Sequence, residues 1–317
     1  MKLVTFETAS GERHIGALRP GEGEVVDFTA SDSAPCFVDM LALVDGGDAA
    51  LEQAQRLLVK GSKVIAVDKV RLLAPIPEPR QIRDFQCSEI HVRNAVMQAR
   101  RLGFVLGFSG EHTTPQDVKL PDIWYRQPPF YKANRFNVVG PDHEIQWPRG
   151  EKHLDYELGF GFVVGKKGRD ISVERAADHI FGYCIFNDIT ARDIQFAEMS
   201  CQLGPAKGKD FDTGNILGPW LVTRDEIPDP YGLEMVARVN GKEWSRGKYE
   251  TNYHKIDKLI AHVSRDETIY PGEFFGLGTV GNGSGIEIGQ FLQPGDIIEI
   301  DVPKMGVLRN RIGHPAS

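Results

Sequence analysis

Short apolar segments separated by turn residues dominate the chain from residue 144 onward. They lie at residues 157–164, 182–186, 220–222, 233–239, 274–277 and 297–302. In the same region only residues 172–177 and 257–263 have the apolar spacing that is typical of a helix. Many short strands with few helices predict a mostly-β fold of the α+β class, with antiparallel or mixed sheets, and argue against a doubly wound parallel sheet.

The first 71 residues have a pattern of their own. It predicts a hairpin around Gly11, with strands at residues 1–6 and 15–18. Two short helices are predicted to follow, at residues 37–44 and 49–59. Residues 72–79 follow with the sequence LLAPIPEP, in which three prolines in five residues favour an extended connection. We therefore expect a small N-terminal α/β domain at residues 1–71 and a larger domain at residues 72–317.

The composition excludes several classes of protein. The 317 residues include 37 Lys and Arg against 44 Asp and Glu, a formal net charge of −7 that argues against a nucleic-acid partner. No apolar run reaches about 18 residues, so we expect no membrane span, and the alternating N-terminus predicts a strand instead of a signal peptide. The four cysteines, at positions 36, 87, 184 and 201, fit neither a zinc site nor a redox pair. These features favour a cytoplasmic protein with reduced thiols.

Three acidic residues stand at the edges of apolar segments. Asp84 precedes Phe85, Glu157 opens the segment 157–164, and Asp188 follows the segment 182–186. Burying an ionised carboxylate is costly unless a cation or hydrogen bonds compensate it. Taken singly, each acid is explained as well by solvent exposure or an arginine partner. Together they predict an oxygen-ligand site for Mg²⁺ or Mn²⁺, with Ca²⁺ as an alternative.

His91 follows Asp84 by seven residues, in a segment at residues 88–101 that has helical spacing. Histidine side chains change charge near neutral pH, so His91 is a candidate general base. A surface or helix-capping histidine is the alternative interpretation. Residues 103–121, which follow, are polar and contain glycines, and we expect a long loop there.

Arg192 and Gln195 lie three residues apart in the segment 187–195. If Asp188 or Thr190 caps a short helix, both side chains share one face of that helix. Arg192 then offers a planar fork to a carboxylate or enolate, and Gln195 offers an amide donor. The spacing favours equally a structural role in which Arg192 pairs with Asp188 or Asp193.

Two glycine-bearing loops resemble nucleotide motifs without matching them. The loop at 204–214 fails the P-loop pattern because Leu203 and Asp210 occupy its first glycine and its Ser/Thr positions. Lys209 in this loop, if near a metal, would stabilise negative charge on an oxygen. The segment 276–281 spells GxGxxG, but the Asn-Gly-Ser-Gly that follows is not expected to open a helix, so we expect no dinucleotide site.

Taken in order, these motifs resemble the fumarylacetoacetate hydrolase family over residues 72 to 313. The resemblance rests on residues 84–91 (DFQCSEIH), 154–157 (LDYE), 187–195 (NDITARDIQ), 208–213 (GKDFDT), 217–220 (LGPW) and 278–279 (GT). It implies a mixed β-roll with a small N-terminal domain, commonly a homodimer. It also implies Mg²⁺- or Mn²⁺-dependent hydrolysis of a carbon–carbon bond in a β-diketone, acylpyruvate or related oxo acid.

Residue roles follow from the same resemblance. Asp84, Glu157 and Asp188 would hold the metal ion and His91 would activate water. The residues expected to contact substrate oxygens or the rest of the substrate are Arg192, Gln195, Lys209, Thr279, Tyr131 and Gln86. Two alternatives remain: the same site decarboxylates, isomerises or hydrates a 2-oxo acid, or the protein has lost activity.

Three positions depart from the family pattern. Gly159 replaces the second glutamate of a Glu-x-Glu pair, and Asp155, two residues before Glu157, is a candidate substitute. Gln86 replaces a tyrosine of the animal-type enzymes, which changes the expected substrate preference. Asn94 replaces the glutamate that follows the histidine in the acylpyruvase branch, so the acidic partner of His91 must lie elsewhere, and Glu287 is the candidate.

Overall fold

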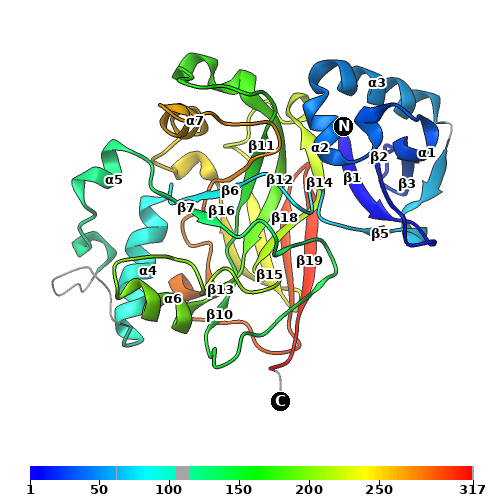
Figure 1. The fold of residues 1–317 in the computed structure, drawn as a ribbon. Coiled ribbons are helices and arrows are strands. Elements are labelled where there is room, and N and C mark those ends of the chain that lie inside the picture. Colours follow the sequence, from blue (N-terminus) through cyan, green and yellow to red (C-terminus); the bar gives the residue numbers. More distant parts are fainter. Residues whose placement is uncertain (62, 105–113, 316–317) are drawn as a thin grey trace.

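The computed structural model describes residues 1–61, 63–104 and 114–315, in which strands predominate over helices (Figure 1). The α+β fold class expected from the sequence is confirmed. Two larger sheets share one apolar core, and a two-stranded ribbon, β10 (Leu154–Asp155) with β13 (Thr190–Ala191), lies beside the site.

Twelve strands of the described chain form the largest sheet. Ten lie in the order β4-β3-β2-β1-β14-β12-β11-β17-β6-β7, while β5 pairs with β1 and β8 pairs with β14. Their bounds are β1 Lys2–Glu7, β2 Arg13–Leu18, β3 Glu24–Asp27, β4 Val64–Ala66, β5 Arg71–Leu72, β6 Ile82–Phe85, β7 Phe130–Ala133, β8 Val138–Val139, β11 Phe160–Val164, β12 Ile180–Asp188, β14 Asn215–Thr223 and β17 Phe274–Gly276. The central strands β12 and β14 are buried along their whole length, as expected for continuous apolar segments covered on both faces.

A second sheet closes the core from the other side. Its strands lie in the order β16-β15-β18-β19-β9, with bounds β16 Lys242–Gly247, β15 Met235–Val239, β18 Ile297–Val302, β19 Gly306–Ile312 and β9 Glu144–Ile145. Along β18 every second residue is buried, because only one face of this strand meets the core. Val222 of β14 and Ile300 of β18 belong to the same apolar cluster, so the two sheets pack face to face.

The N-terminal region contains the predicted hairpin and helices. Strands β1 and β2 pair antiparallel, and the helices are α1 (Phe28–Ser31), α2 (Met40–Asp45) and α3 (Gly47–Lys60). Strand β1 also pairs with β14, with Leu3 opposite Leu221. The N-terminal strands therefore extend the large sheet instead of forming a sheet of their own. The domain boundary at residues 71 and 72 stays a prediction, and β5 spans it.

The remaining helices surround or support the site. They are α4 Glu89–Arg101, α5 Asp122–Arg126, α6 Arg192–Met199, α7 Ile256–Ser264 and α8 Gly285–Ile288. The helices predicted at 88–101 and 257–263 are confirmed as α4 and α7. The one predicted at 172–177 is instead a 3₁₀-helix, Val173–His179. Within the predicted loop at 103–121, residues 105–113 lie outside the described residues.

In the part of the chain that the structure describes, no helix has both the length and the apolar character that crossing a bilayer requires.

Candidate active site

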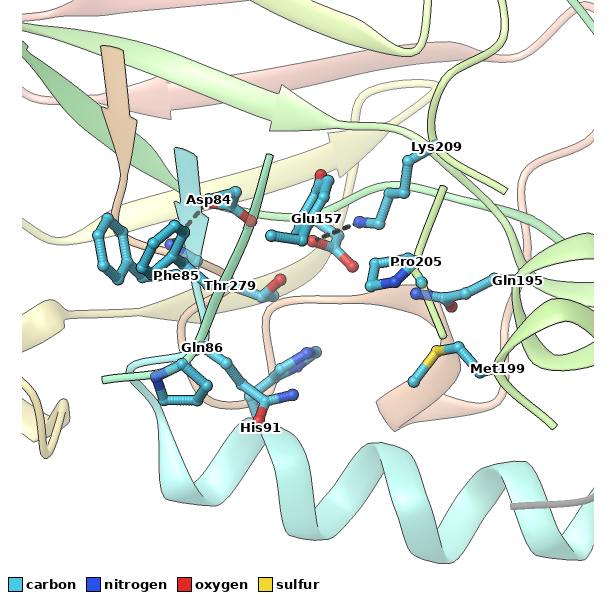
Figure 2. Close-up of a pocket in the computed structure, with 15 residues that line it drawn as sticks. Asp84, Phe85, Gln86, His91, Glu157, Gln195, Met199, Pro205, Lys209 and Thr279 are labelled. Atoms are coloured by element: carbon cyan, nitrogen blue, oxygen red, sulfur yellow. Dashed lines mark hydrogen bonds and ion pairs between the residues drawn. The ribbon is translucent and has the colours of Figure 1, made fainter. Parts of the chain in front are cut away.

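A cavity with a volume of about 250 Å³ opens where β6, β7, α4 and α6 meet (Figure 2). Its walls combine acidic, basic, amide and apolar side chains, namely Asp84, Phe85, Gln86, His91, Pro129, Phe130, Tyr131, Glu157, Gln195, Met199, Gly204, Pro205, Lys209, Gly278 and Thr279. Arg192, Asp188 and Glu287 lie outside this wall. The cavity is small, so it suits a small organic acid.

The structure brings the three predicted carboxylates together. One oxygen each of Asp84, Glu157 and Asp188 lies within 4.8 Å of the others, and all three side chains are buried. Asp84 is the last residue but one of β6, and Asp188 ends β12. Glu157 lies before β11, which starts at Phe160 and not at Glu157 as expected. Gly276 of β17 packs against Asp84, since a Cβ at this position would lie 2.2 Å from Asp84 Oδ1.

Lys209 is the cationic side chain that bridges two members of this cluster. Its Nζ lies 3.1 Å from Glu157 Oε2 and 2.5 Å from Asp188 Oδ2. Tyr131 donates its hydroxyl to the same Asp188 oxygen at 2.5 Å. Asp188 Oδ1, in contrast, is buried and has no hydrogen-bond partner among the described residues. An orphaned carboxylate oxygen inside a protein is costly, and it is a ligand atom available to a metal ion.

The pKa values of the three carboxyl groups differ, because burial raises them and neighbouring cations lower them to different extents. Burial, then the neighbouring Asp188 and Glu157, hold the pKa of Asp84 well above its usual range. Burial also raises the pKa of Asp188 to about 6, against the opposing effect of Lys209. For Glu157, burial is outweighed by Lys209 and Arg192, which lower its pKa to about 2.

The charge count around Glu157 fits a divalent cation. With Asp155, which pairs with Arg192, four buried carboxylates face two cationic side chains, Lys209 and Arg192. Two negative charges remain when all four carboxylates are ionised. Hard oxygen ligands and a deficit of two charges match Mg²⁺ or Mn²⁺, and Ca²⁺ shares the same ligand preference.

His91 and Glu287 form a hydrogen-bonded pair at the rim of the cavity. His91 lies in the first turn of α4, where Ser88 caps the helix by accepting the His91 N–H at 3.2 Å. Its Nδ1 lies 2.8 Å from Glu287 Oε2. A neutral imidazole that donates from Nδ1 keeps its lone pair on Nε2, so this contact fixes the tautomer of a base. Glu287 is thus the acid that contacts His91, and Asn94, which stands where the acylpyruvase branch has its glutamate, donates to Glu287 Oε1 at 3.4 Å.

Glu287 is itself held in place by α8. It occupies the third position of this helix in a capping box with Ser284, whose N–H and hydroxyl both donate to Glu287 Oε2. Asn282 N–H donates to the other oxygen at 2.8 Å. The expectation that residues 282–285 do not open a helix was wrong, because this capping box compensates the poor helix propensity of the glycines.

Each nitrogen of the Arg192 guanidinium donates a hydrogen bond within the protein. Its Nε donates to Asp155 Oδ2 at 2.8 Å, its Nη2 to Glu157 Oε1 at 3.0 Å and its Nη1 to Gln195 Oε1 at 3.0 Å. Arg192 therefore pairs with Asp155 and Glu157 and not with Asp188 or Asp193. Neither Asp188 nor Thr190 caps α6, because both remain in strands and Ala191 precedes the helix. Arg192 and Gln195 do share one face, as expected.

Asp155 does not replace the missing carboxylate at residue 159. Strand β10 pairs with β13, and this pairing directs Asp155 toward Arg192. Its two oxygens also accept the backbone N–H groups of Gly285 at 2.6 Å and Ile286 at 3.0 Å, at the N-terminus of α8. The helix that follows the GxGxxG segment is thus already capped by the carboxylate of Asp155. Because this carboxylate occupies the place where a dinucleotide phosphate would bind, the structure excludes the dinucleotide interpretation.

Tyr249 occupies the place where a second glutamate would project. A Cβ on Gly159 would lie 2.6 Å from the Tyr249 hydroxyl and 2.9 Å from the carbonyl oxygen of Gly278. That hydroxyl accepts the Phe160 N–H at 3.0 Å and donates to the Gly278 carbonyl at 2.6 Å. Sequence reasoning missed Tyr249, since it lies far along the chain in a segment without a motif. Gly159 was the available signal, because a glycine beside a strand allows another group to approach the backbone closely.

Thr279 and the backbone of Gly278 complete the wall opposite α6. Gly278 N–H donates to Asp84 Oδ1 at 3.1 Å, and the hydroxyl of Thr279 is buried without a hydrogen-bond partner among the described residues. Gly278 has a φ of +70°, and a Cβ there would lie 1.9 Å from the Phe85 carbonyl oxygen, so only glycine fits. Thr279 is therefore free to bind an atom of a ligand.

Comparison with known proteins identifies the family. A family model described as "Fumarylacetoacetate (FAA) hydrolase C-terminal" matches residues 82–313. The chain belongs to this family. Oxaloacetate tautomerase fahd2 of Xenopus laevis, a mitochondrial protein, is 31% identical over 315 residues, which cover 98% of this chain and 90% of that protein. Human oxaloacetate tautomerase FAHD2A, also mitochondrial, is 29% identical and covers 98% and 91%.

Solved structures of the family share the fold along the whole chain. Fumarylacetoacetate hydrolase from Exiguobacterium antarcticum is 26% identical with a TM-score of 0.73, covering 99% of each chain. Maleylpyruvate hydrolase from Sphingobium sp. SYK-6, solved with manganese(II) and pyruvate, is 22% identical with a TM-score of 0.73, covering 100% of each. The protein is therefore an enzyme of the fumarylacetoacetate hydrolase superfamily, which includes hydrolases and oxaloacetate tautomerases.

Proposed function

We propose that this enzyme interconverts the keto and enol forms of a 2-oxo acid with the help of a divalent cation. The observation that carries this proposal is the His91–Glu287 pair, which presents a base beside three clustered carboxylates. Removing a proton next to a carbonyl needs only such a base and groups that hold the oxygens. The tautomerases that share 31% and 29% identity with nearly the whole chain support the same reaction.

Each residue has a defined part in this proposal. Asp84, Glu157 and Asp188 hold Mg²⁺ or Mn²⁺, which when bound supplies Lewis acidity for a developing enolate. The Sphingobium hydrolase, solved with manganese(II), supports the choice of ion. Arg192 and Asp155 position Glu157 and Gln195 and do not contact the substrate.

The remaining polar side chains handle the substrate and its proton. His91 Nε2 removes the proton from the carbon next to the carbonyl, and the carboxylate of Glu287 stabilises the imidazolium that forms. The proton is then returned to the enolate oxygen. Lys209, Gln195 and Thr279 donate hydrogen bonds to substrate oxygens, while Tyr131 holds Asp188 through its hydroxyl.

Hydrolysis of a carbon–carbon bond is the second candidate. The hydrolase from Exiguobacterium, 26% identical over 99% of both chains, supports it. In that reaction His91 would take a proton from water instead of carbon. The two reactions give different products: an enol or keto isomer in one, two carbon fragments in the other.

The test is solvent-deuterium exchange at C3 of oxaloacetate, followed by NMR in the presence of Mn²⁺-free Mg²⁺ buffer. We expect exchange faster than the spontaneous rate, and a loss of at least about 100-fold in His91→Ala, the usual effect of removing a general base. His143→Ala, at an exposed histidine outside the cavity, is the matched control. No acceleration by the wild-type protein, or accumulation of two carbon fragments, would contradict a tautomerase. The homodimer and the cytoplasmic location stay predictions.

A further inference from the structure

The amide of Gln86 has a fixed direction at the rim of the cavity. Trp124 Nε1 donates to Gln86 Oε1 at 3.0 Å. An indole N–H only donates, so the atom that receives it must be the amide oxygen and not the amide nitrogen. Gln86 lines the cavity and its Nε2 donates to no acceptor among residues 1–61, 63–104 and 114–315. Two N–H donors of Gln86 are therefore left for a ligand.

Trp124 cannot turn to release this amide. Only 5% of its surface is exposed, and it belongs to an apolar cluster with Val92, Val96, Val118 and Leu120. Its ring lies against the ring of His254 at 4.9 Å between centroids, and His254 Nε2 lies 2.6 Å from the Trp124 carbonyl oxygen. The position of the indole N–H is thus set by packing on several sides.

Gln195 has the same arrangement at another side of the cavity. Its Oε1 accepts from Arg192 Nη1, a group that also only donates, so its Nε2 is likewise left for a ligand. Figure 2 shows Gln86 and Gln195 well apart, with Glu157 and Lys209 nearer to Gln195. The cavity therefore presents amide donors at two separate places, and it suits a ligand with acceptor oxygens at both ends.

Glu89 of α4, the first acid that follows Gln86 in sequence, does not oppose an anion at the rim. It is paired with Arg93 Nη2 and accepts the Tyr125 hydroxyl, whose oxygen lies 2.6 Å away. Asp84, two residues before Gln86, belongs to the carboxylate cluster. A free carboxylate at the rim would repel a second carboxylate on the ligand, whereas that of Glu89 is neutralised. A hydrogen bond to an ionised acceptor is roughly twice as strong as one to a neutral acceptor.

We infer that Trp124 is a positioning residue that holds Gln86 as a donor, and that the pair selects 2-oxo acids with a second carboxylate at the end remote from the carboxylate cluster. This inference rests on the proposed function and names the substrate class, an oxo dicarboxylate. Gln86 binds the distal carboxylate directly, and Trp124 acts only through Gln86.

The kinetic test compares two substrates that differ in the distal group. Solvent-deuterium exchange at C3 is measured for oxaloacetate and for 2-oxobutyrate, which lacks the second carboxylate, in the Mg²⁺-loaded enzyme. Gln86→Glu keeps the oxygen that accepts from Trp124 but turns the donor into a like charge. We expect its KM for oxaloacetate to rise at least about tenfold, the effect of losing one charge-assisted hydrogen bond, and its KM for 2-oxobutyrate to change less than about twofold.

Trp124→Phe separates positioning from a merely structural role. It removes the indole N–H and keeps most of the ring, so we expect a rise of about threefold or more in the KM for oxaloacetate with a smaller change in kcat. In a Gln86→Leu background the same substitution should have no further effect on KM, because no amide is left to orient. An effect of Trp124→Phe that persists in that background overturns the positioning role. Trp244→Phe, away from the cavity, is the matched control.

Binding without turnover distinguishes this inference from the proposed reaction. Calorimetry with malate and lactate, a pair of unreactive hydroxy acids that differ in the distal carboxylate, reports the discrimination directly. A preference for malate that Gln86→Leu and Trp124→Phe both reduce supports the inference, even if oxaloacetate is not turned over. Equal affinities for malate and lactate in the wild-type protein overturn it, even if the enzyme is an active tautomerase.

Discussion

Gly159 and Tyr249 provide a quantitative test of how the site is built. Tyr249 is fully buried, and its hydroxyl is the partner of the Phe160 N–H and the Gly278 carbonyl. Tyr249→Phe leaves both backbone groups buried without that partner. Because a buried group that loses its hydrogen bond costs about 1–3 kcal/mol, we expect the free energy of unfolding to fall by about 2–4 kcal/mol.

Gly159→Ala disturbs the same contact by adding a methyl group opposite the Tyr249 hydroxyl. Its Cβ would lie 2.6 Å from the Tyr249 hydroxyl, so the tyrosine must move and its hydrogen bonds must lengthen. Overpacking of a tight core costs about 1–3 kcal/mol before any lost hydrogen bond is counted. In the double variant the hydroxyl is absent and one of the two close contacts disappears. We therefore expect the double variant to be at least about 1 kcal/mol more stable than the sum of the single effects predicts.

The assay is urea unfolding of the metal-free protein, with Tyr253→Phe as the control, since Tyr253 is 44% exposed. Destabilisations that add within about 0.5 kcal/mol would refute the reasoning, because independent sites behave in that way. A Tyr249→Phe protein as stable as the control would show that the hydroxyl does not support the strand and the Gly278 loop.

Other predictions concern the base and the metal ion. Glu287→Gln keeps a hydrogen-bonding oxygen near His91 but removes the charge that stabilises the imidazolium; we expect kcat for C3 exchange to fall about 10–100-fold, and an unchanged kcat contradicts the pairing. Mn²⁺ at about 100 times its Kd should stabilise the wild-type protein by about 2.7 kcal/mol against unfolding, and Asp188→Asn should lose most of this shift. The pKa of Asp188 is about 6 without metal, so protons compete with the ion below that value. The apparent Kd for Mn²⁺, measured by calorimetry, should therefore rise as the pH falls from 7 to 5, and a pH-independent Kd contradicts a role for Asp188.

The sequence predicts the acidic cluster well because each of its members lies in a local motif. Asp84, Glu157 and Asp188 each stand at the edge of an apolar segment, and the ends of strands in one sheet converge. The partners of Arg192 could not be predicted in the same way. They depend on the pairing of β10 with β13, and spacing along one segment carries no information about the register of another.

Contacts between distant segments account for the other differences. Trp124 lies 38 residues after Gln86, and Tyr249 lies 89 residues after Phe160. Neither belongs to a motif, and the periodicity of apolar residues predicts only that such aromatic side chains are buried. In the sequence, Gly159 and Gln86 stand out only as departures from a family pattern. The structure gives the physical reason for each departure, because it shows the side chain that each residue contacts, Tyr249 and Trp124 respectively.

Asp155 has a consequence for attempts to redesign the substrate range. Its carboxylate holds the start of α8, which carries Glu287, and also Arg192, which carries the hydrogen bond to Gln195. Proton transfer and the recognition of substrate oxygens thus both depend on Asp155, and a substitution of Asp155 disturbs both together. Gln86, at the rim, contacts neither Asp155 nor Arg192. New specificity should therefore be sought at Gln86 and Trp124, with residue 155 left unchanged.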